Sequence, residues 1–469
     1  MGDEVMKKIL PLMMSLIVMF SLSACSSGNT QTKESKNTEQ NHSKNSTNDN
    51  GIKQNREDLS LKVSKDEKKT IVISVMGNTP FFEMAKKEYE KKHPNITIQI
   101  KGFTTKNMLS PVLLEKYLKT TSTEVLSGKG ADLFVLNESS LPVDRFVDKK
   151  AFVNLNHYIN IDTSFDKNQY YMNIIQNSQT NGGLYVLPTR FFLNALFADQ
   201  DAISKTGVKI DDKHNWTWSQ FVEVSKQLKQ KGTLEFAMQD TPDTILNTLV
   251  FEDKNFSQLV NIGKNEAYFN SKFFTDLLMQ VRELYDENVL TEQYSEDGTY
   301  FRSSQIYSPK DYFLRSAVFY KNATIYQMPH SSDKESGVSF VGYDRYAMNA
   351  NSNVKMEAWD YLKFLMSYDM QLQSQTGKFP INKAANEKEF AELKNGTKLD
   401  NPKGRQVTIS EEALQPLKQM ITEANTQVRS NDKIQAIISE ESKSYFSGQK
   451  SAESVADIIQ NRVMTYLNE

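Results

Sequence analysis

The stretch Ile71-Val72-Ile73-Ser74-Val75-Met76 is a nearly continuous apolar run, which is typical of a strand buried on both faces of a sheet. A turn at 77–80 follows it, and then a helical pattern with apolar residues spaced at i, i+3 and i+7. Two further strands are predicted at 96–100 and 132–136, with another helix between them. Strand, helix, strand, helix and strand in this order predict a parallel α/β sheet with right-handed crossovers.

Composition excludes several classes of protein. The chain has 469 residues, 38% apolar and 24% charged, which is enough for two or three globular domains. Its net charge of −2 provides no basic field, so no nucleic-acid partner is expected. A single cysteine excludes internal disulfides and multi-cysteine metal sites. Because the histidines never stand at i, i+4 spacing and no P-loop, HExxH or GxSxG motif is present, we predict no metal, no cofactor and no catalytic residue.

The first residues indicate export from the cytoplasm. Two lysines precede an apolar run at 9–22, which has the length of a signal-peptide core and is too short to span a bilayer. The run ends in Leu22-Ser23-Ala24-Cys25, which resembles the bacterial lipobox. We therefore predict a lipoprotein signal peptide at 1–24 and a lipid on Cys25. The alternative is an ordinary secretory signal with an unmodified cysteine.

The segment 25–69 is predicted to be a lipidated cysteine followed by a disordered tether. Residues 26–58 are almost entirely polar and cannot bury enough apolar surface to offset the entropy of the chain. We interpret the tether as a spacer without a binding role. No later apolar stretch reaches eighteen residues, so we expect a lipid anchor at the extracellular face of the cell membrane, in a Gram-positive cell. The start codon, Met1 or Met6, stays open because the first five residues are acidic.

Four segments, all in register behind the lipobox, resemble the family 1 extracellular solute-binding proteins of ABC importers, the maltose-binding-like group. The resemblance extends from Thr70 to Glu469. The segments that carry it are Tyr89-Glu90-Lys91-Lys92-His93-Pro94-Asn95-Ile96, Gly183-Leu184-Tyr185-Val186-Leu187-Pro188, Ala358-Trp359-Asp360-Tyr361-Leu362-Lys363-Phe364-Leu365-Met366 and Ala452-Glu453-Ser454-Val455-Ala456-Asp457-Ile458-Ile459-Gln460-Asn461-Arg462-Val463.

This resemblance implies a two-lobed clamshell of the type II periplasmic-binding-protein class, in which each lobe is a sheet flanked by helices. Crossing segments form a hinge, and the lobes close on a ligand in the cleft. The expected crossings are at 190–194, 317–319 and 349–353. The expected lobes are an N-lobe of 70–192 plus 317–350 and a C-lobe of 195–316 plus 351–469.

The implied function is non-enzymatic. A monomeric, membrane-anchored protein would capture a small solute, a sugar or oligosaccharide, and deliver it to ABC permease subunits. Three alternatives remain open at this point. The same fold could report its ligand to a membrane sensor kinase. An extracellular carbohydrate-active enzyme would need two carboxylates about 5–10 Å apart across the cleft. A surface adhesin would bind polymers without closing.

Ligands of open α/β sheets bind at the carboxyl ends of the strands, and this rule points to the turn 76–82, the loop 101–105 and residues 137–139. Two of these segments carry predicted contacts. The first is the turn 76–82, where we predict contacts from Asn78 and Phe81. The second contains Asn137 and Glu138, directly after the third strand, whose polar groups match the donors and acceptors of sugar hydroxyls. Alternatively, Asn78 and Asn137 only cap or turn the backbone.

The matched crossing segments supply further candidates. Arg190, Phe191 and Asn194 would form the cleft floor, where aromatic faces stack on sugar rings and a guanidinium offers fixed donors. Strand alternation sends Phe191 and Phe192 to opposite faces, so one of the two belongs to the core. Phe319 lies at the second crossing, where related binders often carry a tryptophan.

The last candidates are Tyr343, Asp344 and Trp216. Tyr343 could stack on a ligand, and Asp344 could accept hydroxyls or pair with a cation. Alternatively, Asp344 and Arg345 form a solvated charge pair. Trp216 is a candidate for stacking, whereas Trp218 is expected to pack against the helix that follows it.

Overall fold

The structure is a computed structural model that describes residues 67–104, 110–214, 216–294, 298–331, 337–374, 376–394 and 409–468. All of them belong to the compact unit 57–469. The predicted signal peptide at 1–24, the lipidated Cys25 and nearly all of the tether at 25–69 lie outside the described residues. Within the described ranges, every helix is too short or too polar to cross a bilayer.

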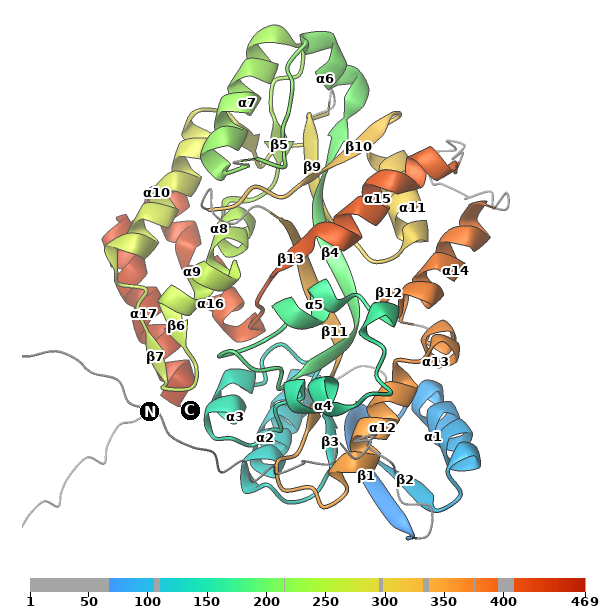
Figure 1. Ribbon diagram of the computed structural model, residues 1–469. Coiled ribbons are helices and arrows are strands. Elements are labelled where there is room, and N and C mark those ends of the chain that lie inside the picture. The colour runs from blue at the N-terminus through green and yellow to red at the C-terminus, as the bar shows by residue number, and fades with distance from the viewer. Residues whose placement is uncertain are drawn as a thin grey trace, which may run out of the picture. The chain divides into compact units, whose positions relative to one another are not determined.

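A mixed sheet forms the centre of the unit, and the strands predicted from apolar runs begin it (Figure 1). Its main order is β2-β1-β3-β11-β4-β9-β5-β8, while β10 and β12 pair with β4 and β13 pairs with β11. The strands are β1 Lys69–Gly77, β2 Ile96–Thr104, β3 Leu133–Val135, β4 Leu187–Asp199, β5 Met238–Gln239, β8 Leu290–Thr291, β9 Phe301–Ile306, β10 Ala323–Gln327, β11 Val338–Met348, β12 Phe379–Pro380 and β13 Ala424–Gln427. A separate hairpin consists of β6 Val260–Asn261 and β7 Glu266–Ala267.

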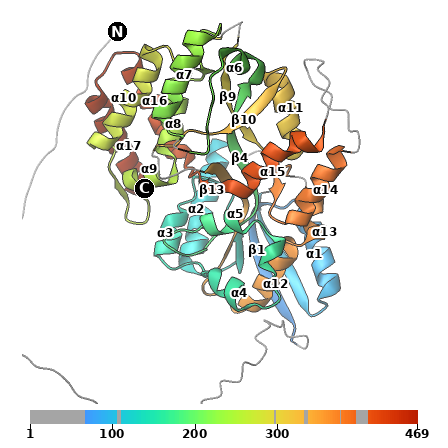
Figure 2. The ribbon, with the colours of Figure 1, turned by 45° about the horizontal axis from the view of Figure 1, so that its top comes forward.

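Strand direction confirms the predicted α/β class. β1 pairs in parallel with both β2 and β3. β11 lies between β3 and β4 and is antiparallel to both. The two long strands β4 and β11 run through the middle of the unit (Figures 1 and 2). The backbone hydrogen bonds between β4 and β11 connect the parallel strands β2, β1 and β3 on one side of the sheet to β9, β5 and β8 on the other.

Three hydrophobic cores hold helices against this sheet, and we call them the first, second and third cores. The first contains α1 Pro80–Lys92, α4 Asn156–Ile161, α5 Met172–Asn177, α11 Pro309–Phe319, α12 Lys355–Leu365, α13 Tyr368–Gln373, α14 Lys383–Lys394 and α15 Glu411–Glu423. The second contains α6 Gln200–Thr206, α7 Trp218–Lys231, α8 Pro242–Val250, α9 Asp253–Leu259, α10 Lys272–Asp286, α16 Asp432–Phe446 and α17 Ala452–Asn468. The third, beside β3, contains α2 Pro111–Ser127 and α3 Val143–Asp148. A short 3-10 helix, η1 Lys167–Gln169, precedes α5.

The structure differs from the predicted lobe boundaries. Helices α12 to α15 pack in the first core with β1 and α1, although the prediction placed 351–469 in the second lobe. The crossing expected at 317–319 lies in helix α11, and the one expected at 349–353 lies before α12. The chain instead joins the second core after β13. An apolar helix face shows that a helix is buried, but it does not say which core buries it.

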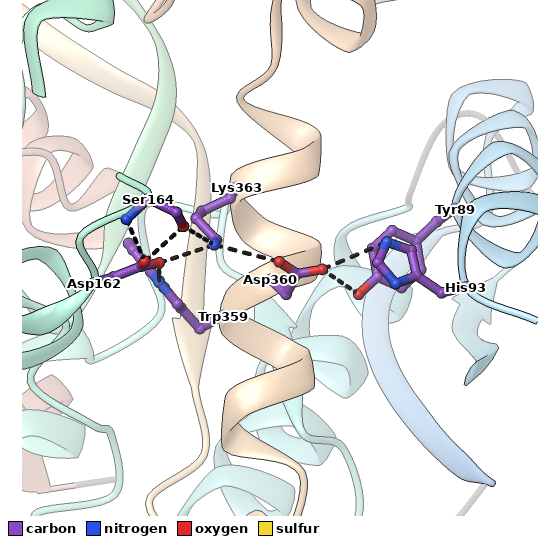
Figure 3. A network of polar contacts seen from close by, with 7 residues as sticks. All are labelled: Tyr89, His93, Asp162, Ser164, Trp359, Asp360 and Lys363. Carbon is purple, nitrogen blue, oxygen red and sulfur yellow. Dashed lines mark hydrogen bonds and ion pairs between the residues drawn. The ribbon is translucent and has the colours of Figure 1, made fainter. Parts of the chain in front are cut away.

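A polar network shows how firmly α12 is held in the first core (Figure 3). The buried carboxylate of Asp162 accepts a hydrogen bond from the indole of Trp359 at 2.8 Å and pairs with Lys363 at 2.8 Å. On the other side of α12, Asp360 accepts a hydrogen bond from the hydroxyl of Tyr89 in α1 at 2.9 Å. Helix α12 is therefore tied both to α1 and to the loop that follows α4.

Candidate functional site

A cavity of about 560 Å³ lies between the second and third cores, against the strands β4 and β11. Loops after β3, the strands β4, β9 and β11, and helices α3, α8 and α16 all contribute to its wall. Its neutral polar side chains are Asn137, Ser139, Ser178, Thr180, Asn194, Thr244, Asn247, Thr248, Ser303, Ser304, Gln305, Ser339, Gln427, Ser430 and Gln435. Such a wall offers both donors and acceptors, as a polyhydroxylated ligand requires.

Aromatic side chains also reach the cavity. Phe192 and Tyr343 project from β4 and β11, and Phe251 and Phe256 come from the second core. The ammonium of Lys378 lies 4.3 Å from the centroid of the Tyr343 ring, so one face of that ring is covered. The three tryptophans are buried in the cores, which leaves stacking to these four rings.

Three predicted site residues line the cavity: Asn137, Asn194 and Tyr343. Asn137 follows β3, as the strand-end rule requires, and its side chain is held in place from both ends. It donates to the carboxylate of Asp344 at 3.2 Å and accepts from the backbone N–H of Arg345 at 3.0 Å. The amide therefore fixes the loop after β3 to β11 while it borders the cavity.

Glu138 and Asp344 lie beside the cavity wall. Burial raises the pKa of Glu138, the carboxylate of Asp432 raises it further, and Arg345 opposes both. Burial also raises the pKa of Asp344, against the pull of Arg190. Asp344 has a φ of +46°, a left-handed conformation that aspartate tolerates better than most residues. Its carboxylate accepts a hydrogen bond from the amide of Asn137, so the structure does not show the alternative of a solvated charge pair with Arg345.

The structure places the other predicted residues away from the cavity. Asn78 is exposed and donates to Glu83 in the first turn of α1. Phe81 packs against Phe82 and the first core. Phe319 contacts Phe197 of β4. None of these side chains belongs to the cavity wall.

Two more candidates are part of the cores. The indole of Trp216 is buried and donates to the carbonyl of Gln327 at 2.8 Å. Phe191 is fully buried and stacks with Phe379 in the first core. Alternation along β4 correctly separated Phe191 from Phe192, but it is Phe192 that faces the cavity. The sequence prediction chose Phe191, which packs in the core, because both faces of the strand are apolar and do not show which one borders the cavity.

The residues that the sequence prediction missed come mainly from the second core. Thr244, Asn247 and Thr248 on α8 and Phe251 at its C-cap are spaced at i, i+3, i+4 and i+7, and all line the cavity. A polar stripe at helical spacing within an otherwise apolar helix was the available signal. Asn431 caps α16 by accepting from the backbone N–H of Ile434, which positions the start of that helix at the wall.

A buried ionic cluster supports the floor of the cavity. Arg190 in β4 is 1% exposed and donates to the backbone carbonyls of Gln371 and Lys378. Its charge stabilises the carboxylate of Asp344 on the neighbouring strand β11. Burial lowers the pKa of Arg190, and Asp344 and Glu389 oppose this. Arg190 was predicted to bind ligand, but in the structure its guanidinium ties β4 to α13 and to the residue before β12.

Glu389 in α14 should make stability depend on pH. Burial raises the pKa of its carboxyl from 4.5 to about 7, although Arg190 pulls in the opposite direction. The folded protein thus binds this proton more tightly than the unfolded chain, so the free energy of unfolding should fall as the pH rises from about 4.5 to about 7. Urea unfolding of Glu389→Gln should show a flatter pH dependence and greater stability than the parent at pH 8.

The matched control is Glu387→Gln, which changes an exposed carboxylate on the same helix. It should keep the slope of the parent protein. If the free energy of unfolding of Glu389→Gln depends on pH as steeply as that of the parent, a group other than Glu389 causes the pH dependence.

Comparisons with known proteins agree with this architecture. The family model described as "Bacterial extracellular solute-binding protein" matches residues 84–401, which is more than half of the chain. The fold is similar to that of a family 1 extracellular solute-binding protein from Alicyclobacillus acidocaldarius, with 14% identity, a TM-score of 0.55 and coverage of 85% of this chain and 98% of that one.

Two further solved structures share the fold. The sugar-binding protein MalE from Xanthomonas citri is 15% identical, with a TM-score of 0.56 and coverage of 85% of this chain and 97% of that one. A periplasmic oligogalacturonide-binding protein from Yersinia enterocolitica is 14% identical, with a TM-score of 0.56 and coverage of 85% and 99%. At these identities the likeness confirms the periplasmic-binding-protein fold. Together with the family match, it shows that the chain belongs to the bacterial extracellular solute-binding protein family.

Proposed function

We propose that this protein captures an oligosaccharide in the cavity between its second and third cores and delivers it to an ABC permease. The observation that supports the ligand class is the cavity wall itself, where neutral hydroxyl and amide side chains from the second core face those from β4, β11 and the loop after β3. Such groups match sugar hydroxyls, and Phe192 and Tyr343 offer rings for stacking. The volume of about 560 Å³ lies within the usual range for small-molecule sites.

Family membership supports a non-enzymatic role in ABC import. The solved structures of the same fold include proteins named for binding sugars and oligogalacturonide, which agrees with an oligosaccharide ligand. A ligand that touches both sides of the cavity would favour closure by its differential affinity for the closed state. We further propose that the protein acts as a monomer, anchored at the extracellular face of the membrane by a lipid on Cys25, because the lipobox-like sequence precedes a polar tether.

A thermal-shift screen of the full chain tests the ligand class. The panel contains neutral oligosaccharides, uronate oligosaccharides, amino acids, peptides and polyamines. A ligand at one hundred times its Kd adds about 2.7 kcal/mol to the free energy of unfolding, so the melting temperature should rise by several degrees with an oligosaccharide series. A shift only with peptides or polyamines would contradict the proposed class.

Two variants locate the site. Asn194→Ala should raise the Kd of the ligand about tenfold by removing a hydrogen bond, and Phe192→Ala should do so by removing a stacking face. The matched control is Asn78→Ala, which changes an exposed asparagine at the end of β1 that lies outside the cavity wall. An affinity loss in Asn78→Ala without one in Asn194→Ala would place the ligand at the turn after β1 instead.

A further inference from the structure

We propose that Arg429 is a latch that holds the two sides of the cavity together through the protein's own side chains. Its guanidinium binds one carboxylate from each side. Nη1 lies 3.0 and 3.1 Å from the two carboxylate oxygens of Asp144, and Nε lies 2.5 Å from Asp253. The inference rests on the proposed function for its consequence, but the latch itself can be tested without a ligand.

The two carboxylates belong to different cores. Asp144 is carried by α3, whose Phe146 and Val147 pack in the third core beside β3. Asp253 is carried by α9, which packs in the second core. The backbone N–H of Arg429 donates to the carbonyl of Phe251 at 3.1 Å, so the arginine is fixed to the side of the second core. The contact with Asp144 therefore crosses from one side of the cavity to the other, and both residues line it.

Two further contacts cross at the same place. The β6–β7 hairpin lies next to α3 in both views of the ribbon (Figures 1 and 2). Here Gly263 is so close to Asp148 that a Cβ atom at 263 would lie 1.5 Å from its carboxylate. The hydroxyl of Tyr466 in α17 donates to the carbonyl of Ser140 at 3.5 Å. A side chain at 263 would require the carboxylate of Asp148 to move aside, so the two surfaces meet closely here.

The character of these contacts favours a reversible latch over a fixed interface. Charged or polar atoms make the Arg429–Asp144 and Tyr466–Ser140 contacts, and the side chains of the Arg429–Asp144 pair are 20% and 24% exposed. Burial lowers the pKa of Arg429, but the two aspartates outweigh this and raise it, so the charges compensate one another. An ion pair of this exposure is screened by salt, unlike the apolar packing within each core.

The latch has a consequence for solute binding. Because Asp144 and Arg429 line the cavity, separating them widens it on that side. A solute that enters or leaves the cavity on that side can pass only while Asp144 and Arg429 are separated. Once the solute is bound, the pair re-forms and stabilises the closed state. Weakening the latch should therefore speed both association and dissociation of the solute.

A disulfide trap measures the latch directly. In a full chain with Cys25→Ser, the pair Asp148→Cys and Gly263→Cys is introduced. A Cβ at 263 would lie 3.3 Å from the Cβ of Asp148, close to the spacing of about 3.5–4.5 Å found in disulfides. The rate of oxidation under a fixed redox buffer then reports how often the two sides of the cavity meet. No solute is added, so failure of the oligosaccharide hypothesis would not affect the result.

We expect rapid crosslinking in this parent protein. Adding Arg429→Gln or Asp144→Asn should slow it about three- to tenfold, and 1 M NaCl should slow the parent but not these two variants. The matched control is Arg462→Gln, because Arg462 also binds two carboxylates, Glu440 and Glu441, but entirely within the second core. Circular dichroism confirms that each variant is folded.

Three results would overturn the latch. One is an equal crosslinking rate in the parent, Arg429→Gln and Asp144→Asn. Another is no crosslinking in the parent at all. A slower rate in Arg462→Gln equal to that in Arg429→Gln would also contradict it, because it would show a general loss of rigidity.

Discussion

Replacing Asp162 with asparagine should lower the free energy of unfolding by about 2–4 kcal/mol, because it removes the charge from a buried ion pair. The carboxylate accepts hydrogen bonds from Trp359 and from the backbone and hydroxyl of Ser164, and it pairs with Lys363 (Figure 3). Its side chain is 0% exposed. Asparagine keeps an acceptor for the indole but leaves the half-buried ammonium of Lys363 with Asp360 as its remaining carboxylate partner.

The pH dependence of Asp162 gives a second measurement on the same variant. Burial raises its pKa, but the bonds from Lys363, Ser164 and Trp359 outweigh burial and lower it from the ordinary value of 3.8. The stability that this carboxylate contributes is therefore fully present above about pH 4 and is lost as the pH falls through the folded-state pKa. Asp162→Asn should consequently cost most near neutral pH and progressively less in acid.

Urea unfolding followed by tryptophan fluorescence measures both effects, since Trp359 donates directly to Asp162. The matched control is Asp276→Asn, which breaks the exposed pair between Lys272 and Asp276 on α10. It should cost less than about 1 kcal/mol. Equal losses in the two variants would show that burial adds nothing to the Asp162 pair.

This network also shows where prediction from sequence reached its limit. The apolar runs at 71–76 and 96–100 predicted β1 and β2, because a strand buried on both faces needs a continuous run. The aromatic and apolar stripe of α12 predicted a buried helix, but its partner α1 is more than two hundred residues earlier in the chain. Periodicity carries no information about such distant pairs, so the helix was assigned to the wrong side of the cavity.

The strand-end rule selected both Asn137, which lines the cavity, and Asn78, which does not, and strand order explains the difference. The order β1-β3-β11-β4 puts the end of β3 directly beside β11, which pairs with β4, whereas the end of β1 is one strand further away. Consequently the loop after β3 borders the cavity and the turn after β1 is exposed. The insertion of β11 comes from residues two hundred positions later, which the local pattern near β1 does not reveal.

Arg190→Met should destabilise the protein by about 3–5 kcal/mol, an effect at least as large as that of Asp162→Asn. The guanidinium is 1% exposed and donates to the carbonyls of Gln371 and Lys378. Methionine fills much of the same volume but leaves both carbonyls without this donor. It also removes the cation that stabilises the carboxylate of Asp344, whose pKa burial already raises.

A double-mutant cycle separates these two causes. Asp344→Asn keeps the left-handed backbone at φ +46°, which asparagine also adopts, and it keeps an acceptor for the amide of Asn137. If the buried charge of Asp344 accounts for part of the cost, Arg190→Met should cost about 1–2 kcal/mol less in the Asp344→Asn background than alone. Additive losses would show instead that Arg190 acts only through the two carbonyls.

The cycle bears on binding as well. Arg190 and Asp344 lie on the neighbouring strands β4 and β11, and Asn137, which lines the cavity, donates to Asp344. Arg190 was predicted to contact the ligand. If it did, Arg190→Met would lower the affinity for the solute, and it would do so whether or not Asp344 is also replaced. The structure leads to the opposite expectation. Conditions that keep Arg190→Met folded should leave its solute affinity within about threefold of the parent, whereas Asn194→Ala should lose about tenfold while keeping its stability. We thus expect the buried cation of Arg190 to determine stability and the side chain of Asn194, which lines the cavity, to determine affinity.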